Sequence, residues 1–382
     1  MACPRGAGVL LISGLTGVAV ACALPYEMQR AGPAGSPCPE VSEPPAENAP
    51  PDTTELRWYR SASGRDQELG GEWCATVGAP VFLGRPTGSF SEWRVGDSLV
   101  VLSWNMHVGG GDVHELLDVE LGLDCSAQRP AQRPGFPPFL LLLQNAYRTS
   151  ESLPAVASGT NVPRAIDPDV RSLEDLDIVT VAGRCGLALH YVASARNGPD
   201  SGPRPREDKG NAILSTLPLT TPIAIDLPIE GARKVAVAAT VVLPGDERLR
   251  VVSADIEGLS TLVRTLVSGN QTRTRQVSGL IDALERAQDD GPLTGAALVG
   301  GDFSSWDDAE TALLLMREAF GESPAWDGRS TRGPFSTDHI FFRRGSFVTI
   351  TVGHYERLEN AYGSNHFGRR VAVNYLPRRG SG

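Results

Sequence analysis

Several polar residues at the ends of short apolar runs could meet in one catalytic cleft. A buried strand that ends in a polar residue presents that side chain at the edge of its sheet, where α/β proteins bind ligands. Gly301-Asp302 alone would indicate only a strand followed by a turn. A set of such ends predicts a shared cleft containing carboxylates, amides and a histidine. The residues are Asn105, Asn145, Asp255, Asp302, Asp338 and His366.

These residues belong to short motifs that extend over about residues 97–376. In chain order the motifs are Ser-Trp-Asn105, Leu-Leu-Leu-Gln-Asn145, Gly210-Asn-Ala-Ile-Leu-Ser-Thr-Leu-Pro-Leu219, Gly301-Asp302-Phe303, Asp338-His-Ile-Phe and Gly-Ser364-Asn365-His366. Their order resembles that of the endonuclease/exonuclease/phosphatase superfamily, which has the DNase I-like fold. The sequence Arg196-Asn197-Gly198 is similar to a loop of its exported bacterial branch. The resemblance implies a four-layer α/β/β/α sandwich of two mixed sheets flanked by helices.

The resemblance also implies roles for individual residues. In that family a divalent ion, usually magnesium, polarises a phosphodiester, and a histidine held by an aspartate acts at the attacking water. Asn105 matches the asparagine near the metal and the phosphate. Asp302 matches the aspartate proposed to activate water or assist the leaving group, and Asp338 with His366 matches the Asp–His dyad. The residues expected to contact a phosphate-containing substrate are Arg196, Asn197, Asn211 and Ser304.

Four positions depart from the family pattern. The metal-binding glutamate is replaced by Asn145, and the aspartate before the final histidine by Asn365. Ser304 stands where the family has an asparagine, and Asp255 where it has a histidine or tyrosine. Because magnesium prefers carboxylate oxygen, the two amides predict weak binding of Mg²⁺ or Mn²⁺. Asp255 adds one carboxylate near the site, but its negative charge would also repel a phosphate.

Two functions therefore remain open. The first is a metal-dependent hydrolase of phosphodiesters or phosphomonoesters with impaired activity, supported by the motif order and by Asp338 and His366. The second is a catalytically inactive relative that keeps the fold and binds a phosphorylated ligand or a protein partner. It is supported by the four replacements, because losing one catalytic group typically costs orders of magnitude in rate.

The elements that must position these residues are expected from the hydrophobic pattern. Strands are expected at 97–104, 139–144, 176–182, 187–193, 234–243, 248–255, 297–302, 337–342, 347–352 and 370–376, and helices at 66–77, 113–123, 273–287 and 307–320. Trp104 and Trp306 are expected to be core residues that flank the cleft.

Composition limits the class of partner. The chain has 382 residues, 41% of them hydrophobic, so it can fill a sizeable core. The net charge of −10 repels a polyanion at long range, so no stable nucleic-acid complex is expected. A monomer is expected. The basic residues are almost all arginine, and Lys209 and Lys234 are the only lysines, a usage that suggests a GC-rich coding sequence.

The N-terminus has the features of an export signal. Arg5 precedes an apolar run over 8–20 that is too short to span a bilayer comfortably, and Ala19-Val20-Ala21-Cys22 follows. Residues 1–22 are therefore expected to be a signal peptide. Cleavage before Cys22 would give a protein attached to the cell envelope by a lipid on that cysteine. Cleavage after Ala21 by the ordinary route would instead release a periplasmic or extracellular protein.

The remaining chain divides into three parts. Residues 23–54 are rich in Pro, Ala, Gly and Glu without hydrophobic periodicity, which predicts a flexible tether. An N-terminal helical and loop extension is expected at 55–96, and the hydrolase-like domain at 97–378.

Four cysteines would remain in the exported form. They are Cys38, Cys74, Cys125 and Cys185, and their spacing does not match that of zinc ligands. Four cysteines allow three pairings, which the sequence does not distinguish. An oxidising compartment favours one or two disulfides. Isolated buried thiols are the alternative.

Overall fold

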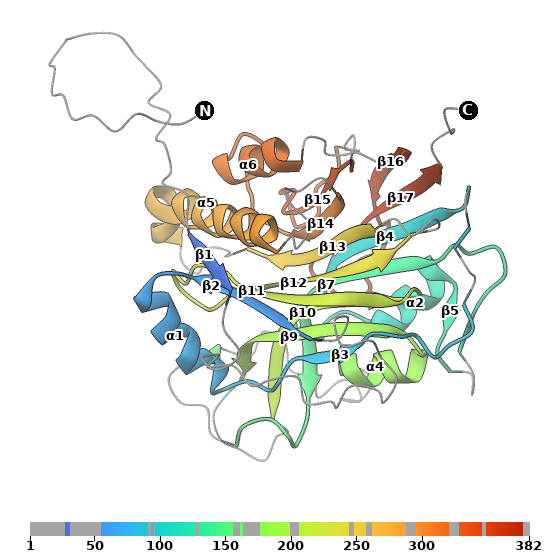
Figure 1. The fold of residues 1–382 in the computed structure, drawn as a ribbon, viewed down its shortest axis with the longest axis horizontal. Coiled ribbons are helices and arrows are strands. Elements are labelled where there is room, and N and C mark those ends of the chain that lie inside the picture. Colours follow the sequence, from blue (N-terminus) through green and yellow to red (C-terminus); the bar gives the residue numbers. More distant parts are fainter. Residues whose placement is uncertain are drawn as a thin grey trace, which may run out of the picture.

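The structure of the protein is a computed structural model that describes most of the chain from residue 55 onward. The described residues are 27–30, 55–90, 93–94, 96–126, 130–155, 161–162, 176–198, 206–243, 248–256, 262–287, 295–320, 328–345 and 349–376. The expected signal peptide, Cys22 and Cys38 lie outside these residues. Figure 1 shows the described elements in sequence colours.

The first large sheet is mixed and has seven strands. Their order is β1 (Met28–Arg30), β2 (Arg57–Ser61), β11 (Leu219–Asp226), β12 (Val235–Val242), β13 (Arg248–Asp255), β14 (Ala296–Asp302) and β15 (Asp338–Arg343). The pairs β2–β11 and β13–β14 are parallel, and the other pairs are antiparallel. This sheet carries Asp255, Asp302 and Asp338 at strand ends.

The second large sheet is also mixed and has eight strands. Their order is β16 (Thr349–Arg357), β17 (Arg369–Leu376), β4 (Ser98–Asn105), β7 (Phe139–Thr149), β10 (Glu207–Ser215), β9 (Ala188–Asn197) and β3 (Val81–Leu83), with β8 (Asn161–Val162) paired to β9. A separate pair joins β5 (Leu123–Asp124) to β6 (Ala131–Gln132). The second sheet carries Asn105 at the end of β4. Asn145 lies beside it but within β7, because this strand continues past the expected end at residue 144 to Thr149.

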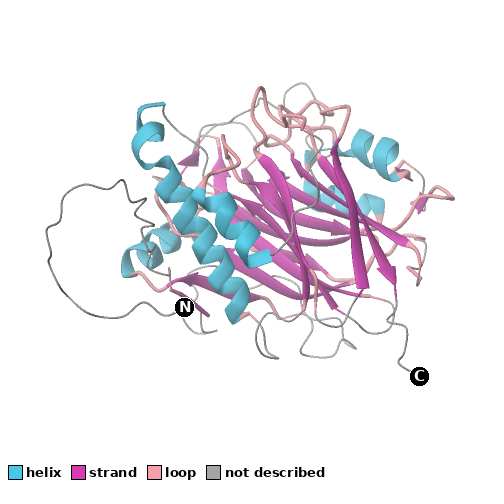
Figure 2. Cartoon of the chain, turned by 90° about the horizontal axis from the view of Figure 1, so that it is seen from above, coloured by secondary structure: helices cyan, strands magenta, loops and turns pink. Residues whose placement is uncertain are grey.

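Helices cover the outer face of each sheet. α5 (Leu262–Arg286) and α6 (Thr311–Phe320) pack on the first sheet, and α2 (Val113–Leu121) and α4 (Ile178–Cys185) pack on the second. A third apolar cluster, which includes Leu142, Ile213, Val251 and Leu298, fills the space between the sheets. Figure 2 shows helices on both sides of the strands. The expected four-layer α/β/β/α sandwich is therefore confirmed.

Residues 55–96 are part of this sandwich. Their strands β2 and β3 join the first and second sheets, and α1 (Gly64–Cys74) packs against β2 and β9. Within the segment expected to be a tether, β1 pairs with β2 and the side chain of Met28 is buried. That part of the segment is docked on the first sheet.

The expectation of a strand over residues 176–182 is wrong, because α4 begins there. Asp177 caps the helix, and its carboxylate accepts a hydrogen bond from the backbone N–H of Thr180. Gly186 ends the helix in the left-handed conformation at φ 66°. The buried residues follow helical spacing and are Ile178, Val181, Ala182 and Cys185. A short apolar run does not distinguish a buried strand from a buried helix.

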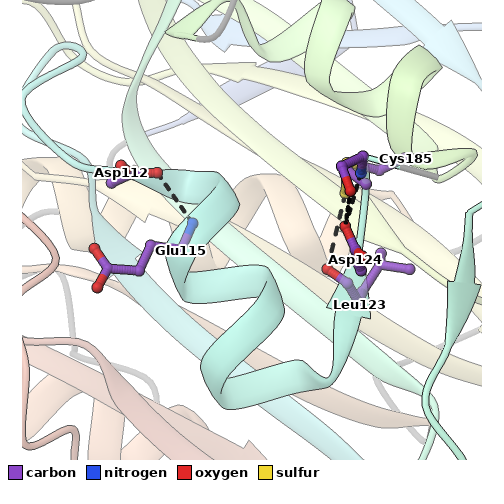
Figure 3. Close-up of a disulfide and its surroundings, with 7 residues drawn as sticks. Asp112, Glu115, Leu123, Asp124 and Cys185 are labelled. Carbon is purple, nitrogen blue, oxygen red and sulfur yellow. Dashed lines mark hydrogen bonds between the residues drawn. A yellow bond between two sulfur atoms is a disulfide. The ribbon is translucent and has the colours of Figure 1, made fainter.

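A disulfide joins α4 to the loop that follows β5. It links Cys125 to Cys185 with 4.7 Å between their Cα atoms, and a ring nitrogen of His114 in the first turn of α2 lies within 4.8 Å of both sulfur atoms. Figure 3 shows the disulfide and the start of α2, where the Asp112 carboxylate accepts a hydrogen bond from the backbone N–H of Glu115. Cys74 is also disulfide-bonded. The expectation of disulfides is confirmed for the three cysteines that the structure describes, and the alternative of isolated thiols does not apply to them.

None of the helices within the described ranges combines the length and apolarity needed to cross a membrane.

Candidate active site

Strand register and sheet stacking bring the polar strand ends together. In the first sheet Asp302 lies beside Asp255 on one side and beside Asp338 on the other. In the second sheet Asn105 is the neighbour of Gln144, the residue before Asn145. Across the sandwich β14 packs on β4, β15 on β17, β13 on β7 and β12 on β10. Two rows of polar residues therefore face each other at one edge.

The two glycines before Asp302 allow the close packing at this edge. A Cβ atom on Gly300 would lie 2.8 Å from atoms of Leu142 and Ser103 on the opposite sheet. A Cβ atom on Gly301 would lie 2.1 Å from the carbonyl oxygen of Ala254 on the neighbouring strand. Glycine removes both clashes, so β14 can deliver Asp302 directly against β4.

Asp302 is a buried carboxylate held by hydrogen bonds from two sides. The side-chain amide of Asn105 donates to its Oδ2 at 2.9 Å, and the backbone N–H of Ser304 donates to its Oδ1 at 2.8 Å. Ser304 has φ 47°, which closes the turn after the strand. Ser304, expected to contact the substrate, therefore lies at the site and holds Asp302.

Asp338 and His366 form a hydrogen-bonded pair next to Asp302. Nδ1 of His366 lies 2.9 Å from Oδ2 of Asp338, and the hydroxyl of Thr337 donates to the same oxygen at 2.9 Å. Nε2 of His366 lies 3.8 Å from Oδ2 of Asp302. The indole N–H of Trp104 donates to the backbone carbonyl of His366 at 3.1 Å, which fixes the histidine backbone.

Burial and charge set the protonation of this group. Burial raises the pKa of Asp302 to about 6, and the negative charge of Asp338 adds to the effect. Burial alone would lower the pKa of His366, but the carboxylates of Asp338 and Asp302 outweigh it and raise this pKa above its ordinary value. Burial would raise the pKa of Asp338, but its bond to His366 keeps that pKa low. Protonated His366 and ionised Asp338 therefore stabilise each other.

A chain of side-chain contacts runs from Asp302 to a lysine that the motifs did not identify. The Asn145 amide donates to Oδ1 of Asn105 at 3.3 Å, and Nζ of Lys209 donates to Oδ1 of Asn145 at 3.1 Å. Oδ1 of Asn105 also accepts from the backbone N–H of His107 at 3.0 Å. The carboxylate at one end and the ammonium at the other fix both amides, with Asn105 donating toward Asp302.

A second lysine lies at the same edge. Nζ of Lys234 is 2.7 Å from Oδ2 of Asp255. The side chain of Asn211 donates to the backbone carbonyl of Val235 at 2.6 Å, and so ties the start of β12 to β10. The amino-acid composition could have pointed to Lys209 and Lys234 as site residues, because the chain has no other lysine.

Arg196 and Asn197, which were also expected to contact substrate, instead make hydrogen bonds to other parts of the fold. The guanidinium of Arg196 donates to the backbone carbonyl of Pro154 at 2.8 Å, and the Asn197 amide donates to Glu207 at 2.9 Å. Both side chains are buried near the end of β9. Asn365 is exposed beside His366.

The two tryptophans that flank the site differ in exposure. Trp104 is buried as expected, whereas Trp306 is 45% exposed, so the expectation of a core position for it is wrong. The Trp306 ring stacks on Phe335, with 5.0 Å between the ring centroids. The turn after Ser305 carries its ring outward.

The fit of a divalent ion differs between the two halves of the site. Asp302, Asp338 and His366 offer ligand atoms within 4.8 Å of one another and could hold a metal ion. His366 already bonds Asp338 through Nδ1, so it would meet an ion through Nε2, which faces Asp302. At the family's glutamate position the residues do not fit Mg²⁺, because Asn145 is neutral and its oxygen accepts from the ammonium of Lys209.

Comparisons with known proteins agree with the motif order. Residues 102–366 match the sequence profile described as the Endonuclease/Exonuclease/phosphatase family. A search of curated proteins gave no match.

The following three solved structures are among those to which this chain is similar. An endonuclease/exonuclease/phosphatase from Beutenbergia cavernae is 15% identical over 73% of this chain and 72% of its own, with a TM-score of 0.47. The human Nocturnin catalytic domain, solved with a bound sulfate anion, is 14% identical over 73% of this chain and 95% of its own, with a TM-score of 0.47. Sphingomyelinase C from Streptomyces griseocarneus is 15% identical over 72% and 99%, with a TM-score of 0.44.

Proposed function

This chain belongs to the endonuclease/exonuclease/phosphatase family, and we propose that it is an exported hydrolase of phosphate esters. One observation carries the proposal. Asp338 orients His366 through a 2.9 Å hydrogen bond, and the other ring nitrogen of His366 lies 3.8 Å from the Asp302 carboxylate. A base and a cationic donor at this separation can act on one water and one phosphoryl group.

The proposed reaction is attack of water on phosphorus. Asp302, when ionised, accepts a proton from the attacking water, and a new P–O bond forms. Protonated His366 donates a hydrogen bond to a phosphoryl oxygen on which negative charge develops. The P–O bond to the leaving group breaks on the opposite side of phosphorus from the water, and the leaving oxygen takes its proton from solvent. Asp338 and Asn105 are positioning residues for His366 and Asp302.

Electrostatics favour a small phosphate ester as the substrate over a nucleic acid. The net charge of −10 disfavours a long polyanion. Mg²⁺ or Mn²⁺ remains the cofactor that the family resemblance implies, and Asp302 with His366 is the place that could hold it. The roles of Asp302 and His366 given above do not require it.

Export and lipid attachment are part of the proposal. The apolar run over 8–20 and Cys22 support a lipid-anchored protein of the cell envelope. The disulfide between Cys125 and Cys185 supports an oxidising compartment. Labelling of whole cells with a radioactive fatty acid tests the anchor, with Cys22→Ser as the variant that should lose the label.

The catalytic proposal is tested with the protein starting at Ala23, which retains β1. Hydrolysis of p-nitrophenyl phosphate and bis(p-nitrophenyl) phosphate is followed with and without Mg²⁺. We expect turnover that Asp302→Asn lowers by at least about 100-fold, since general acid–base groups contribute that much. Asp118→Asn, a half-exposed carboxylate on α2, is the matched control and should be unchanged. Equal rates for Asp302→Asn and the wild type would contradict the proposal.

A second candidate function is binding without catalysis. The replacement of a metal-binding carboxylate by Asn145, with Lys209 bonded to it, favours this candidate. It predicts saturable binding of phosphate esters or of a phosphorylated partner with no turnover under any metal condition.

A further inference from the structure

The only two lysines of the chain both place their ammonium groups at the candidate active site. The sequence has 35 basic Lys and Arg residues, and all of them except Lys209 and Lys234 are arginine. Lys209 donates to Asn145, and Lys234 pairs with Asp255. Arginine is a planar fork, whereas the lysine ammonium is a compact point charge that binds phosphate well. The chain therefore places a compact ammonium group at two positions of the site, Lys209 and Lys234, although its other basic residues are all arginine.

The two sheets arrange these groups as two parallel rows. Along β12, β13, β14 and β15 the first row is Lys234, Asp255, Asp302 and Asp338. Along β10, β7, β4 and the residues before β17 the second row is Lys209, Asn145, Asn105 and His366. The stacking of β12 on β10 and of β15 on β17 places both lysines at one end and the Asp338–His366 pair at the other.

The charges of the two rows balance without a metal ion. Three carboxylates, of Asp255, Asp302 and Asp338, face three groups that can carry positive charge, Lys209, Lys234 and His366. The family glutamate would add a fourth carboxylate at position 145. In this chain that position is neutral, and an ammonium stands beside it.

The amide oxygens near Lys209 already accept hydrogen bonds. Oδ1 of Asn105 accepts from the backbone of His107 and from Asn145, and an oxygen has two lone pairs to offer. Oδ1 of Asn145 accepts from Lys209. A flipped Asn105 would turn its oxygen toward the Asp302 carboxylate and its N–H groups toward the N–H of His107. In this arrangement the side-chain oxygens of Asn105 and Asn145 therefore accept hydrogen bonds from N–H donors.

We propose that Lys209 supplies the positive charge that a divalent ion supplies in the family, so that this cleft binds the phosphoryl group of its ligand without a metal. Lys234 neutralises Asp255, whose charge would otherwise repel phosphate at this place. The inference rests on the proposed phosphate-ester site but not on its catalysis.

The test is calorimetric titration of inorganic phosphate into the protein starting at Ala23, first in EDTA and then in excess Mg²⁺. We expect equal affinity in the two buffers, within about twofold. Lys209→Gln should weaken binding in EDTA by at least about tenfold, the effect of losing a charge-assisted hydrogen bond. Lys209→Arg keeps the charge and should weaken it less. Arg317→Gln, a half-exposed cation on α6, is the control and should be unchanged.

The outcomes separate this inference from the proposed hydrolase. Binding that needs Mg²⁺, or no binding in either buffer, overturns the inference, and neither result depends on the folding of a variant. Phosphate binding in EDTA without turnover supports the inference, contradicts the proposed hydrolase and favours the second candidate function, binding without catalysis. Turnover that occurs only with Mg²⁺, together with phosphate binding that also needs it, supports the hydrolase and overturns the inference.

Discussion

Replacing Lys209 and Asn145 together should create the Mg²⁺ site that this chain lacks at the family's glutamate position. The double variant Asn145→Glu, Lys209→Met places a carboxylate at position 145 and removes the ammonium 3.1 Å from the side-chain oxygen there. The single variant Asn145→Glu should fail, because the new carboxylate would pair with Lys209 instead of a metal. Lys209→Met alone should also bind Mg²⁺ weakly, because its ligands remain neutral amides.

The contact distance sets the size of this effect. An ion about 2.1 Å from the oxygen at position 145 would lie at most about 5 Å from the Lys209 nitrogen. Repulsion between a divalent ion and a unit charge at that distance is about 7 kcal/mol at an effective dielectric constant of about 20, and about 2 kcal/mol in bulk water. Because about 1.4 kcal/mol is tenfold in affinity, removing the ammonium should improve Mg²⁺ binding at least tenfold.

Calorimetric titration of Mg²⁺ at pH 7.5 measures the effect in the wild type, the two single variants and the double variant. The double variant should bind Mg²⁺ at least about tenfold more tightly than Asn145→Glu alone. If Asn145→Glu with Lys209 in place binds Mg²⁺ as tightly as the double variant, the ammonium does not oppose the metal. If the wild type binds Mg²⁺ as tightly as the double variant, then Asn145 beside Lys209 is no obstacle to Mg²⁺ binding.

Two further predictions concern pH and covalent structure. Because burial raises the pKa of Asp302 to about 6, the folded protein retains a proton between about pH 4 and 6 that the unfolded chain releases. The free energy of unfolding should therefore fall by up to about 3 kcal/mol as the pH rises from 4 to 7, and hydrolysis should rise through about pH 6 as Asp302 ionises. Urea unfolding at both pH values checks this, and an equal fall in Asp302→Asn would contradict it. The disulfide between Cys125 and Cys185 spans 60 residues, so Cys125→Ala with Cys185→Ala should cost about 4 kcal/mol. Urea unfolding compared with the wild type measures that loss, and an unchanged midpoint would show that the cross-link is not stabilising.

Local patterns predicted the strand ends of the site well. Apolar runs bounded by polar residues predicted that Asn105, Asp302 and Asp338 lie at strand ends, and the structure brings them together with His366 at one edge of the sandwich. This worked because strand period and glycine content are local properties of the sequence. The two glycines before Asp302 are also required by packing, because Gly300 faces the opposite sheet and Gly301 faces the neighbouring strand, and only the folded structure reveals these contacts.

One feature that the sequence analysis did not predict is local, and the others depend on contacts between distant segments. The run over 176–182 is short and apolar, and the cap at Asp177 and the end at Gly186 decide that it is a helix. Arg196 was expected to contact phosphate, but it donates to a backbone carbonyl in a distant loop. Composition alone sets Lys209 and Lys234 apart in the sequence, because their place beside Asn145 and Asp255 depends on strand order and sheet stacking.

The rate of bis(p-nitrophenyl) phosphate hydrolysis by wild type and His366→Gln tests the proposed role of the Asp338–His366 pair most directly. Glutamine keeps much of the size and hydrogen-bonding capacity of histidine but cannot carry the positive charge that Asp338 and Asp302 stabilise. We expect kcat/KM to fall by at least about 100-fold under conditions in which the variant is shown to be folded. A variant that hydrolyses the ester at the wild-type rate would show that His366 has no part in catalysis.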